Sequence, residues 1–411
     1  MKKILLSMAA VCLFAVSAFA AYPDSYTNPV ITAMPSLTIA PDARAAGLGD
    51  IGVATDPDLN SQHWNAAKYA YMESHGGITA NYTPWLRKLG VTDLDLAYLA
   101  GYYKWDDVQG VSMGFTYFSM GNVSITNADG TDMGVTARPY ELALDASYYR
   151  KLHEYVSMAA TLRFLYSDMN NGLNMSTGVV GATELKPAWT MAADIALFYK
   201  QPIDIPMGTS YFNLGFTLQN LGGKMTYDEM TSNFIPASMN IGATYELPFD
   251  KYNRLTFSLE ANKMMVPTRK SRKTTAETGL NGMDFDKENS DTWTLSQDAY
   301  TKLTSVKGIF QSFGDAPFGA KEEFDEVRWG AGIEYSYNRQ FFGRVGYSHE
   351  NFIKGNRRYV TVGAGFHLSI FSLDFAYCIG VAPSNPLDQT MRFTLGFDLA
   401  GIKDLVNNRK N

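Results

Sequence analysis

Strict alternation of large apolar residues with small or polar residues recurs along the chain from about residue 77 onward. Between Val111 and Tyr117, valine, methionine, phenylalanine and tyrosine alternate with serine, glycine and threonine. The same period of two runs through residues 155–167, 210–219 and 390–399. A period of two is typical of a β-strand whose two faces meet different surroundings. The pattern therefore predicts strands, and not helices, for most of the chain.

Most of these alternating segments have the length of a tilted strand that crosses a bilayer, about 9–11 residues. If the large apolar face meets lipid and the small or polar face lines a lumen, they form an all-β, transmembrane antiparallel β-barrel of about 14 strands. A soluble sandwich also alternates, but its exposed face should carry more charge. The predicted strands are residues 77–85, 93–105, 110–119, 139–150, 155–167, 187–199, 210–219, 236–246, 254–263, 327–337, 341–348, 358–368, 371–379 and 390–399.

The connections between these segments alternate between short and long. The short series is 106–109, 151–154, 200–209, 247–253, 338–340 and residue 370, and the long series includes 120–138, 168–186, 220–235 and 264–326. Outer-membrane barrels have short periplasmic turns and long extracellular loops. An even number of strands then places both ends of the barrel chain, and with them both chain termini, on the periplasmic side.

The start of the chain predicts export. Lys2 and Lys3 precede an apolar run from Ile4 to Val16, and Ala18-Phe19-Ala20 supplies small residues before a cleavage point. This is the pattern of a secretory signal peptide over residues 1–20. We therefore expect the protein in the cell outer membrane.

Three further segments complete the predicted organisation. Residues 21–76 are rich in glycine and other small residues, too broken for a strand and too polar to face lipid. A 14-stranded barrel has a lumen wider than its own side chains fill. We therefore expect a periplasmic or lumenal plug here, with a loose tail as the alternative. The barrel occupies residues 77–399, and residues 400–411 form a periplasmic tail.

Composition and charge narrow the function further. Aromatic residues make up 13% of the chain and charged residues 18%, as in a barrel with aromatic girdles at the membrane interfaces. A net charge of −6 gives no indication of the positively charged surface that nucleic-acid binding requires. Removal of the signal peptide leaves Cys378 as the single cysteine, which excludes an internal disulfide. Charges on the predicted lumen face are expected to pair with one another and not to mark a transport path: Glu141, Asp145, Arg163, Asp194, Glu260, Arg328, Glu334, Arg344 and Arg392.

No arrangement of residues predicts catalysis, a cofactor or a metal site, so we expect a protein that is not an enzyme. Gly363-Ala364-Gly365 falls inside an alternating strand and is therefore not a phosphate-binding loop. Asp284, Asp286 and Glu288 resemble the start of a calcium loop, but Asn289 stands where the loop requires glycine.

The 264–326 loop is far longer than an ordinary connection, and such loops are commonly functional. Its apolar positions near residues 297–313 fall at helical spacing and predict a short amphipathic helix. Candidate contacts with cargo or a partner are Trp293, Ile309, Phe310, Phe313 and Phe318, with packing inside the protein as the alternative. Candidate contacts with lipopolysaccharide phosphates are Arg269, Lys270, Arg272 and Lys273, with an ordinary solvated loop as the alternative.

Residues 36–50, SLTIAPDARAAGLGD, resemble the N-terminal signature of the PorV family of the type IX secretion system in Bacteroidetes. Residues 61–68 (SQHWNAAK), 219–222 (QNLG) and 390–399 (TMRFTLGFDL) fit the same family, and PorQ-like barrels share parts of the pattern. The resemblance implies a FadL-like barrel with an N-terminal plug. It also implies a carrier that binds the C-terminal signal domain of secreted cargo and takes it from a SprA/Sov-like translocon to a PorU-like attachment complex. A FadL-like transporter of fatty acids or other hydrophobic molecules remains the alternative.

Overall fold

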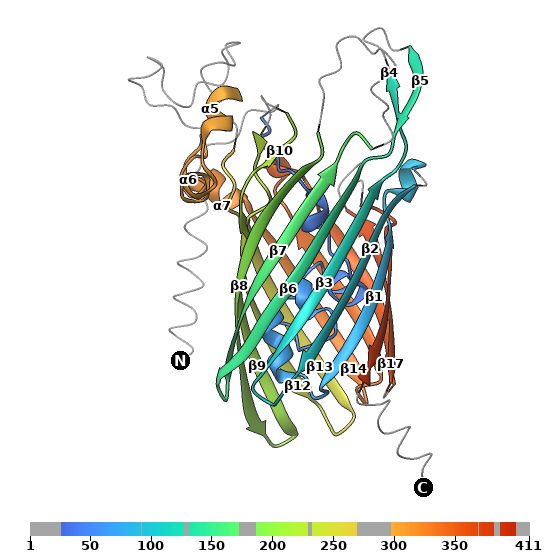
Figure 1. Cartoon of the computed structure of the whole chain (residues 1–411). Helices are drawn as coiled ribbons and strands as arrows, with labels where there is room; N and C mark the ends of the chain where they lie inside the picture. Colours follow the sequence, from blue (N-terminus) through green and yellow to red (C-terminus); the bar gives the residue numbers. More distant parts are fainter. Residues whose placement is uncertain are drawn as a thin grey trace.

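Antiparallel strands close into a barrel that dominates the computed structural model (Figure 1). The structure describes residues 26–91, 93–126, 131–171, 186–228, 232–268, 297–368, 370–381 and 387–399. Within these residues the wall strands are β1 (Gly76–Pro84), β2 (Leu94–Lys104), β3 (Gln109–Met120), β6 (Tyr140–His153), β7 (Val156–Asp168), β8 (Ala188–Ile205), β9 (Gly208–Gly222), β12 (Ser238–Pro248), β13 (Asn253–Met264), β14 (Val327–Tyr337), β15 (Phe341–His349), β16 (Tyr359–His367), β17 (Phe371–Gly380) and β18 (Met391–Asp398). β1 pairs with both β2 and β18, which closes the wall.

The predicted barrel is confirmed, and each of the predicted segments corresponds to one wall strand. The alternation also gives the two faces correctly. On β3, Met113 and Phe115 are exposed on the outer face, whereas Ser112 and Thr116 are buried toward the lumen. Burying a polar group without a partner is costly, so small polar residues face an interior that offers hydrogen bonds.

β8 and β9 are longer than the sequence predicts. Residues 200–209 were expected as a loop, yet the ladder continues to Ile205 paired with Gly208, leaving a two-residue turn. Lys200, Gln201 and Asp204 carry no apolar alternation. The prediction failed because a strand that extends beyond the bilayer has water on its outer face and no longer needs apolar residues there.

The longer connections gather at one end of the barrel, called here the long-loop end, and the opposite end is the short-turn end (Figure 1). The long-loop end carries two small hairpins, β4 (Val123–Thr126) with β5 (Asp132–Ala137) and β10 (Met225–Thr226) with β11 (Ser232–Asn233). It also carries η3 (Arg87–Leu89), α5 (Gln297–Lys302), α6 (Ser305–Gln311), α7 (Ala320–Asp325) and η6 (Phe352–Lys354). Over the part of the chain that the structure describes, no helix has the length and hydropathy needed to cross a membrane.

The expected plug lies inside the barrel (Figure 1) and consists of short elements: η1 (Pro35–Thr38), α2 (Ala43–Gly47), α3 (Ser61–Trp64) and η2 (Ala66–Tyr71). Its direction differs from the expectation. Tyr26 donates to Glu322 on α7, and the amide of Asn28 donates to Ile353, so the described chain begins at the long-loop end. It then runs through the barrel and enters β1 at the short-turn end. The expectation that the chain before β1 starts at the same end of the barrel as the short turns is therefore wrong for Tyr26.

Candidate functional site

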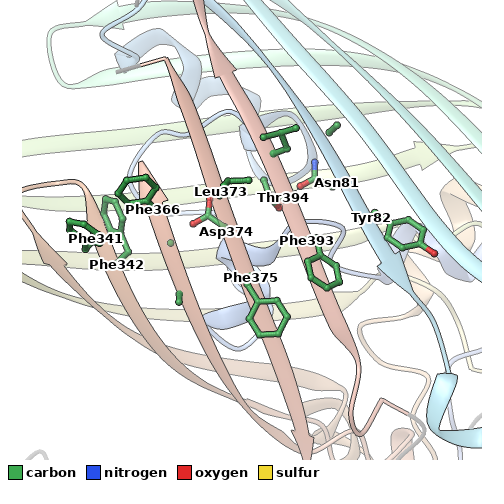
Figure 2. Close-up of a pocket in the computed structure, with 14 residues that line it drawn as sticks. Asn81, Tyr82, Phe341, Phe342, Phe366, Leu373, Asp374, Phe375, Phe393 and Thr394 are labelled. Atoms are coloured by element: carbon green, nitrogen blue, oxygen red, sulfur yellow. Dashed lines mark hydrogen bonds between the residues drawn. The ribbon is translucent and has the colours of Figure 1, made fainter. Parts of the chain in front are cut away.

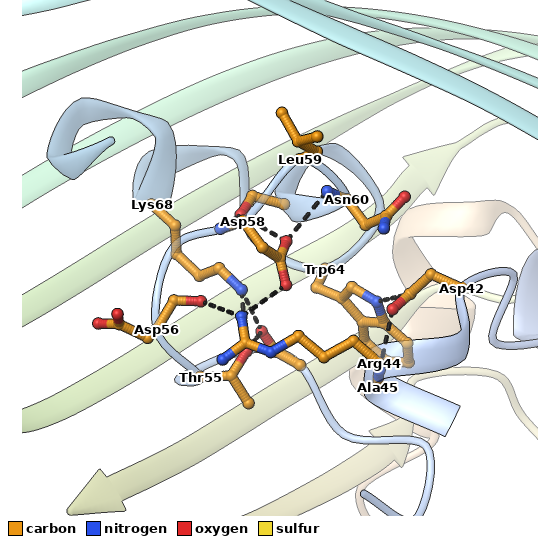
Figure 3. A network of polar contacts seen from close by, with 12 residues as sticks. Asp42, Arg44, Ala45, Thr55, Asp56, Asp58, Leu59, Asn60, Trp64 and Lys68 are labelled. Atoms are coloured by element: carbon orange, nitrogen blue, oxygen red, sulfur yellow. Dashed lines mark hydrogen bonds and ion pairs between the residues drawn. The ribbon is translucent and has the colours of Figure 1, made fainter. Parts of the chain in front are cut away.

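Arg44 on α2 binds other residues of the plug (Figure 3) and also binds the barrel wall. Its guanidinium donates to both carboxylate oxygens of Glu334 on β14 at 3.2 and 3.0 Å. It also donates to Asp58 at 2.9 Å and to the main-chain oxygen of Asp56 at 2.8 Å. The planar guanidinium offers five donors in a fixed fork, so one side chain can hold a wall carboxylate and a plug loop together.

Two further side chains fix the plug loop from within. Asp42 caps α2 by accepting from the amide of Ala45 at 2.9 Å, and its other oxygen accepts from Trp64 Nε1 at 2.7 Å (Figure 3). Lys68 is fully buried and donates to the main-chain oxygen of Gly52 at 2.8 Å and to Thr55 Oγ1 at 3.0 Å. Asp42, Arg44, Trp64 and Lys68 all belong to the two plug motifs of the sequence. These motifs therefore position the plug, a role that sequence reasoning did not assign.

Glycines on the lumen face let the plug backbone approach the wall closely. A Cβ on Gly346 would lie 2.1 Å from the main chain of Leu48 and Gly49, and a Cβ on Gly215 would lie 2.2 Å from Val53 O. Gly363, in the glycine pair that was rejected as a phosphate loop, lies against Gly47 instead. The plug backbone is thus in direct contact with the wall at these glycines, and little free space remains between plug and wall there.

Most lumen-facing charges form ion pairs, as expected. Arg163 lies 2.6 Å from Asp145 and 3.0 Å from Asp194. Arg344 lies 2.6 Å from both Glu334 and Asp374. Two of the predicted charges bind the plug instead. Glu260 accepts from the amides of Gly52 and Val53 at 2.9 and 2.8 Å, and Glu141 accepts from the hydroxyl and amide of Ser36.

Among the residues that the structure describes, cavities remain inside the barrel. One at the short-turn end has a volume of about 430 Å³ and is lined largely by polar and charged side chains, among them Asp56, Lys200, Arg254 and His367. The other lies beside His63 and Trp64 and has a volume of about 40 Å³. That smaller volume is of the order of one water molecule, about 30 Å³. It cannot hold an apolar ligand of useful size.

An apolar groove of about 690 Å³ lies on the wall across β1 and β15–β18 (Figure 2). The exposed rings of Phe375, Phe393 and Tyr82 border it. Its inner edge is formed by polar groups that are already bonded. Asp374 binds Arg344, and Thr394 Oγ1 accepts from the amide of Ala43 in the plug at 2.9 Å. The groove therefore opens toward the lipid side of a wall that the plug backs.

The predicted amphipathic helix near residues 297–313 is two short helices, α5 and α6. Thr304 separates them and accepts from the amide of Lys307, which caps the start of α6. Leu303 and Ile309 pack into a buried cluster with Phe234, Met265 and Tyr300. The prediction of one helix was wrong because helical spacing alone does not detect a capping residue at its centre.

The candidate contact residues separate into different groups. Phe310 and Phe313 are exposed, at 76% and 46%, and so is Phe324 on α7 at 62%. Ile309 packs inward, and Phe318 lies edge-on to Tyr26 with ring centroids 4.9 Å apart. Outside the described residues lie the remaining candidates, Trp293, Arg269, Lys270, Arg272 and Lys273. The exposed aromatic surface at the long-loop end, made of Val306, Phe310, Phe313 and Phe324, is called here the outer aromatic surface.

Comparison with known families decides the relationship. A family model described as type IX secretion system protein PorV matches residues 23–271, more than half of the chain. The chain belongs to the PorV family. The match runs from the plug through β13, so it covers both plug motifs and Arg44. The family that the sequence resembles is thereby confirmed, and PorV is a family of secretion proteins.

Solved structures similar to this PorV-family chain include transporters and channels. The toluene transporter TodX of Pseudomonas putida is 10% identical, with 86% of this chain and 95% of that chain covered and a TM-score of 0.46. A Pseudomonas aeruginosa FadL homologue is 10% identical, with 90% and 99% covered and a TM-score of 0.44. CymD, a monoaromatic hydrocarbon channel, is 13% identical, with 92% and 97% covered and a TM-score of 0.44. No curated protein sequence matches the chain.

Proposed function

We propose that this protein binds the C-terminal signal domain of secreted cargo at the outer aromatic surface. In this proposal it carries cargo from a SprA/Sov-like translocon to a PorU-like attachment complex in the same outer membrane. Membership of a type IX secretion family supports the assignment to secretion. The exposure of Phe310 at the long-loop end supports the location of the binding surface.

The outer aromatic surface has the character of a partner site. Phe310 and Phe324 are largely exposed, whereas the nearby Ile309 and Phe318 are partly buried against other residues of the protein. Aromatic side chains, phenylalanine included, are enriched at protein–protein interfaces relative to the rest of the surface. Phe324 lies 5.8 Å from the ring of Trp329 at the start of β14, so the surface continues onto the barrel rim.

A site-specific photocrosslinker tests the proposal directly. Placed at residue 310, it should form covalent adducts with cargo C-terminal domains in intact cells that secrete. Placed at residue 249, in the β12–β13 turn at the short-turn end, it should form none, although Phe249 is also exposed at 47%. Equal adducts at both positions, or none at residue 310, would contradict the assignment.

The triple variant Phe310→Ser, Phe313→Ser and Phe324→Ser should bind cargo domains at least about tenfold more weakly, because hot-spot side chains each contribute about 2 kcal/mol or more. The variant should still insert and resist heat like the unmodified barrel, since these side chains make little buried contact. Phe249→Ser is the matched control. Normal surface delivery of cargo by the triple variant would refute the proposed surface.

The apolar groove on β1 and β15–β18 is the observation that favours a transporter of hydrophobic molecules. Such a transporter needs a path that continues from the groove into the lumen. Purification of the protein from native membranes separates the two functions. Recovery of large secretion components supports the cargo carrier, whereas a bound lipid without any protein partner would favour the transporter.

A further inference from the structure

We propose that Asp315, Glu323 and Glu326 form a calcium site at the long-loop end, which fastens α7 to the loop before it. This inference goes beyond cargo binding, because it concerns how the outer loops are held over the plug. One ligand-capable oxygen from each of the three residues lies within 4.8 Å of the others. Oxygens on opposite sides of a calcium ion are separated by about 5 Å, since each lies about 2.3–2.6 Å from the ion.

The three carboxylates are withdrawn from solvent, unlike an ordinary acidic surface. Asp315 is 4% exposed and Glu326 is 9% exposed. One oxygen of Asp315 accepts from the amide of Thr268 at 2.8 Å, while the other, Oδ1, is buried and has no hydrogen-bond partner. A buried carboxylate oxygen without a partner is costly. A bound cation would supply the missing interaction.

The charge balance of this network also calls for a cation. Lys263 donates to Glu323 at 2.9 Å and to Glu326 at 2.6 Å. Lys354 donates to Glu326 at 2.8 Å and to Glu322 at 2.6 Å. Within the described residues, these ion pairs join Glu322, Glu323 and Glu326 to two ammonium groups, and Asp315 adds a fourth carboxylate beside them. Burial, together with the charge of Glu326 and Glu323, raises the pKa of Asp315 to about 7.

The ligand set selects the kind of ion. All three groups are carboxylates, and hard oxygen ligands suit calcium or magnesium better than zinc or copper. Magnesium requires oxygens at about 2.0–2.1 Å in a near-ideal octahedron, whereas calcium accepts wider and less regular arrangements. Asp315 lies on a loop, Glu323 on α7 and Glu326 directly after α7, and Glu323 and Glu326 already share the ammonium group of Lys263. Such a set fits the less regular geometry of calcium.

Such an ion would act on the N-terminal segment as well. Glu322 on α7 accepts from Tyr26 Oη at 2.9 Å, from Asn28 Nδ2 at 2.9 Å and from the amide of Phe318 at 3.1 Å. Anything that holds α7 in place therefore also holds the start of the plug. The rival interpretation is that the lysine side chains Lys263 and Lys354 are sufficient cations for this cluster.

The test uses the purified full chain in detergent, with calcium chloride, magnesium chloride or chelator added. Calorimetry should give a calcium dissociation constant on the order of 10⁻⁴ to 10⁻³ M, as in extracellular modules. Calcium at ten times that value should slow hydrogen exchange in residues 315–326 and 26–28 about tenfold. Magnesium should do so more weakly.

Asp315→Asn separates the two interpretations. Under the proposal, the variant loses the calcium-dependent protection and binds calcium at least about tenfold more weakly, because one charged ligand is gone. If the lysines are the cations of the cluster and no ion binds, the new amide can donate to a neighbouring carboxylate, so the variant is better protected than the unmodified chain without any calcium. Asp325→Asn, on the same helix and outside the three ligands, should keep the full response to calcium. Absence of any calcium effect on the unmodified chain overturns the proposal.

Discussion

At the scale of single residues, glycines on the lumen face decide how closely the plug can lie against the wall. β15 provides a direct comparison, because Gly346 faces the plug and Gly343 faces outward. A Cβ at Gly346 would meet backbone atoms of Leu48 and Gly49 at 2.1 Å, and backbone atoms of a packed segment cannot move aside as a side-chain end can. At Gly343 no atom lies within 4 Å of an added Cβ.

Gly346→Ala should therefore unseat the plug while the barrel still forms, with a cost of about 1–3 kcal/mol for the overpacked contact. The measurements are protease cleavage within residues 26–75 and ion conductance in planar bilayers, both of which should rise. Gly343→Ala should behave like the unmodified protein in both. Similar behaviour of the two variants would show that the approach of Gly49 does not hold the plug.

At the scale of elements, Lys224 holds α5 on the barrel. Its ammonium donates to the main-chain oxygens of Tyr300, Thr301 and Leu303 at 2.8, 3.1 and 3.1 Å, at the C-terminal end of the helix. It also lies 4.3 Å from the ring centroid of Phe234. Cations are favourable at helix C-termini, and the ring face adds a second attraction. Burial lowers the pKa of Lys224, so the contact is made in partly desolvated surroundings.

Lys224→Met keeps an apolar stem of similar length but removes the donor. We expect α5 to loosen by about 1–2 kcal/mol, from the helix-terminus and cation–π contributions together. Hydrogen exchange of residues 297–303 should accelerate by roughly a factor of ten, which is 1.4 kcal/mol. Lys251→Met, in the β12–β13 turn, serves as the control and should leave these amides unchanged. Unaltered exchange in the Lys224 variant would assign α5 to the apolar cluster alone.

At the scale of the whole molecule, the two ends of the plug lie at opposite mouths of the barrel. Ile31 is exposed at the long-loop end, and Met207 is exposed in the β8–β9 turn at the short-turn end. Cys378 is buried and should not react. A single cysteine at position 31 therefore reports the side of the membrane that the long-loop end of the barrel faces, and one at position 207 reports the side that the short-turn end faces.

Ile31→Cys should react with a membrane-impermeant maleimide on intact cells, because long loops of outer-membrane barrels face outward. Met207→Cys should react only after the outer membrane is permeabilised. Labelling of residue 207 and not residue 31 on intact cells would reverse the assigned orientation.

The barrel could be predicted because lipid imposes a period of two on every wall strand, so local sequence carries the signal. The plug could be located, since residues 26–75 lack that period, but its contacts could not be predicted. Arg44 and Glu334 are 290 positions apart, and no local pattern links them. The same limit applies to the proposed ligand Asp315, whose neighbours include Lys263 on another element.

Because Tyr26 and Gly76 lie at opposite ends of the barrel, the segment between them runs through the closed wall. The wall closes where β1 pairs with β18, and β1 directly follows the plug segment in the chain. Once the plug is seated, its close backbone contacts with the lumen-face glycines leave no room for a folded domain to pass through the barrel. The order of assembly is therefore constrained. We expect residues 26–34 to pass to the long-loop end before the plug is seated, and a folded domain fused ahead of Tyr26 to remain at the side of the barrel where it folded.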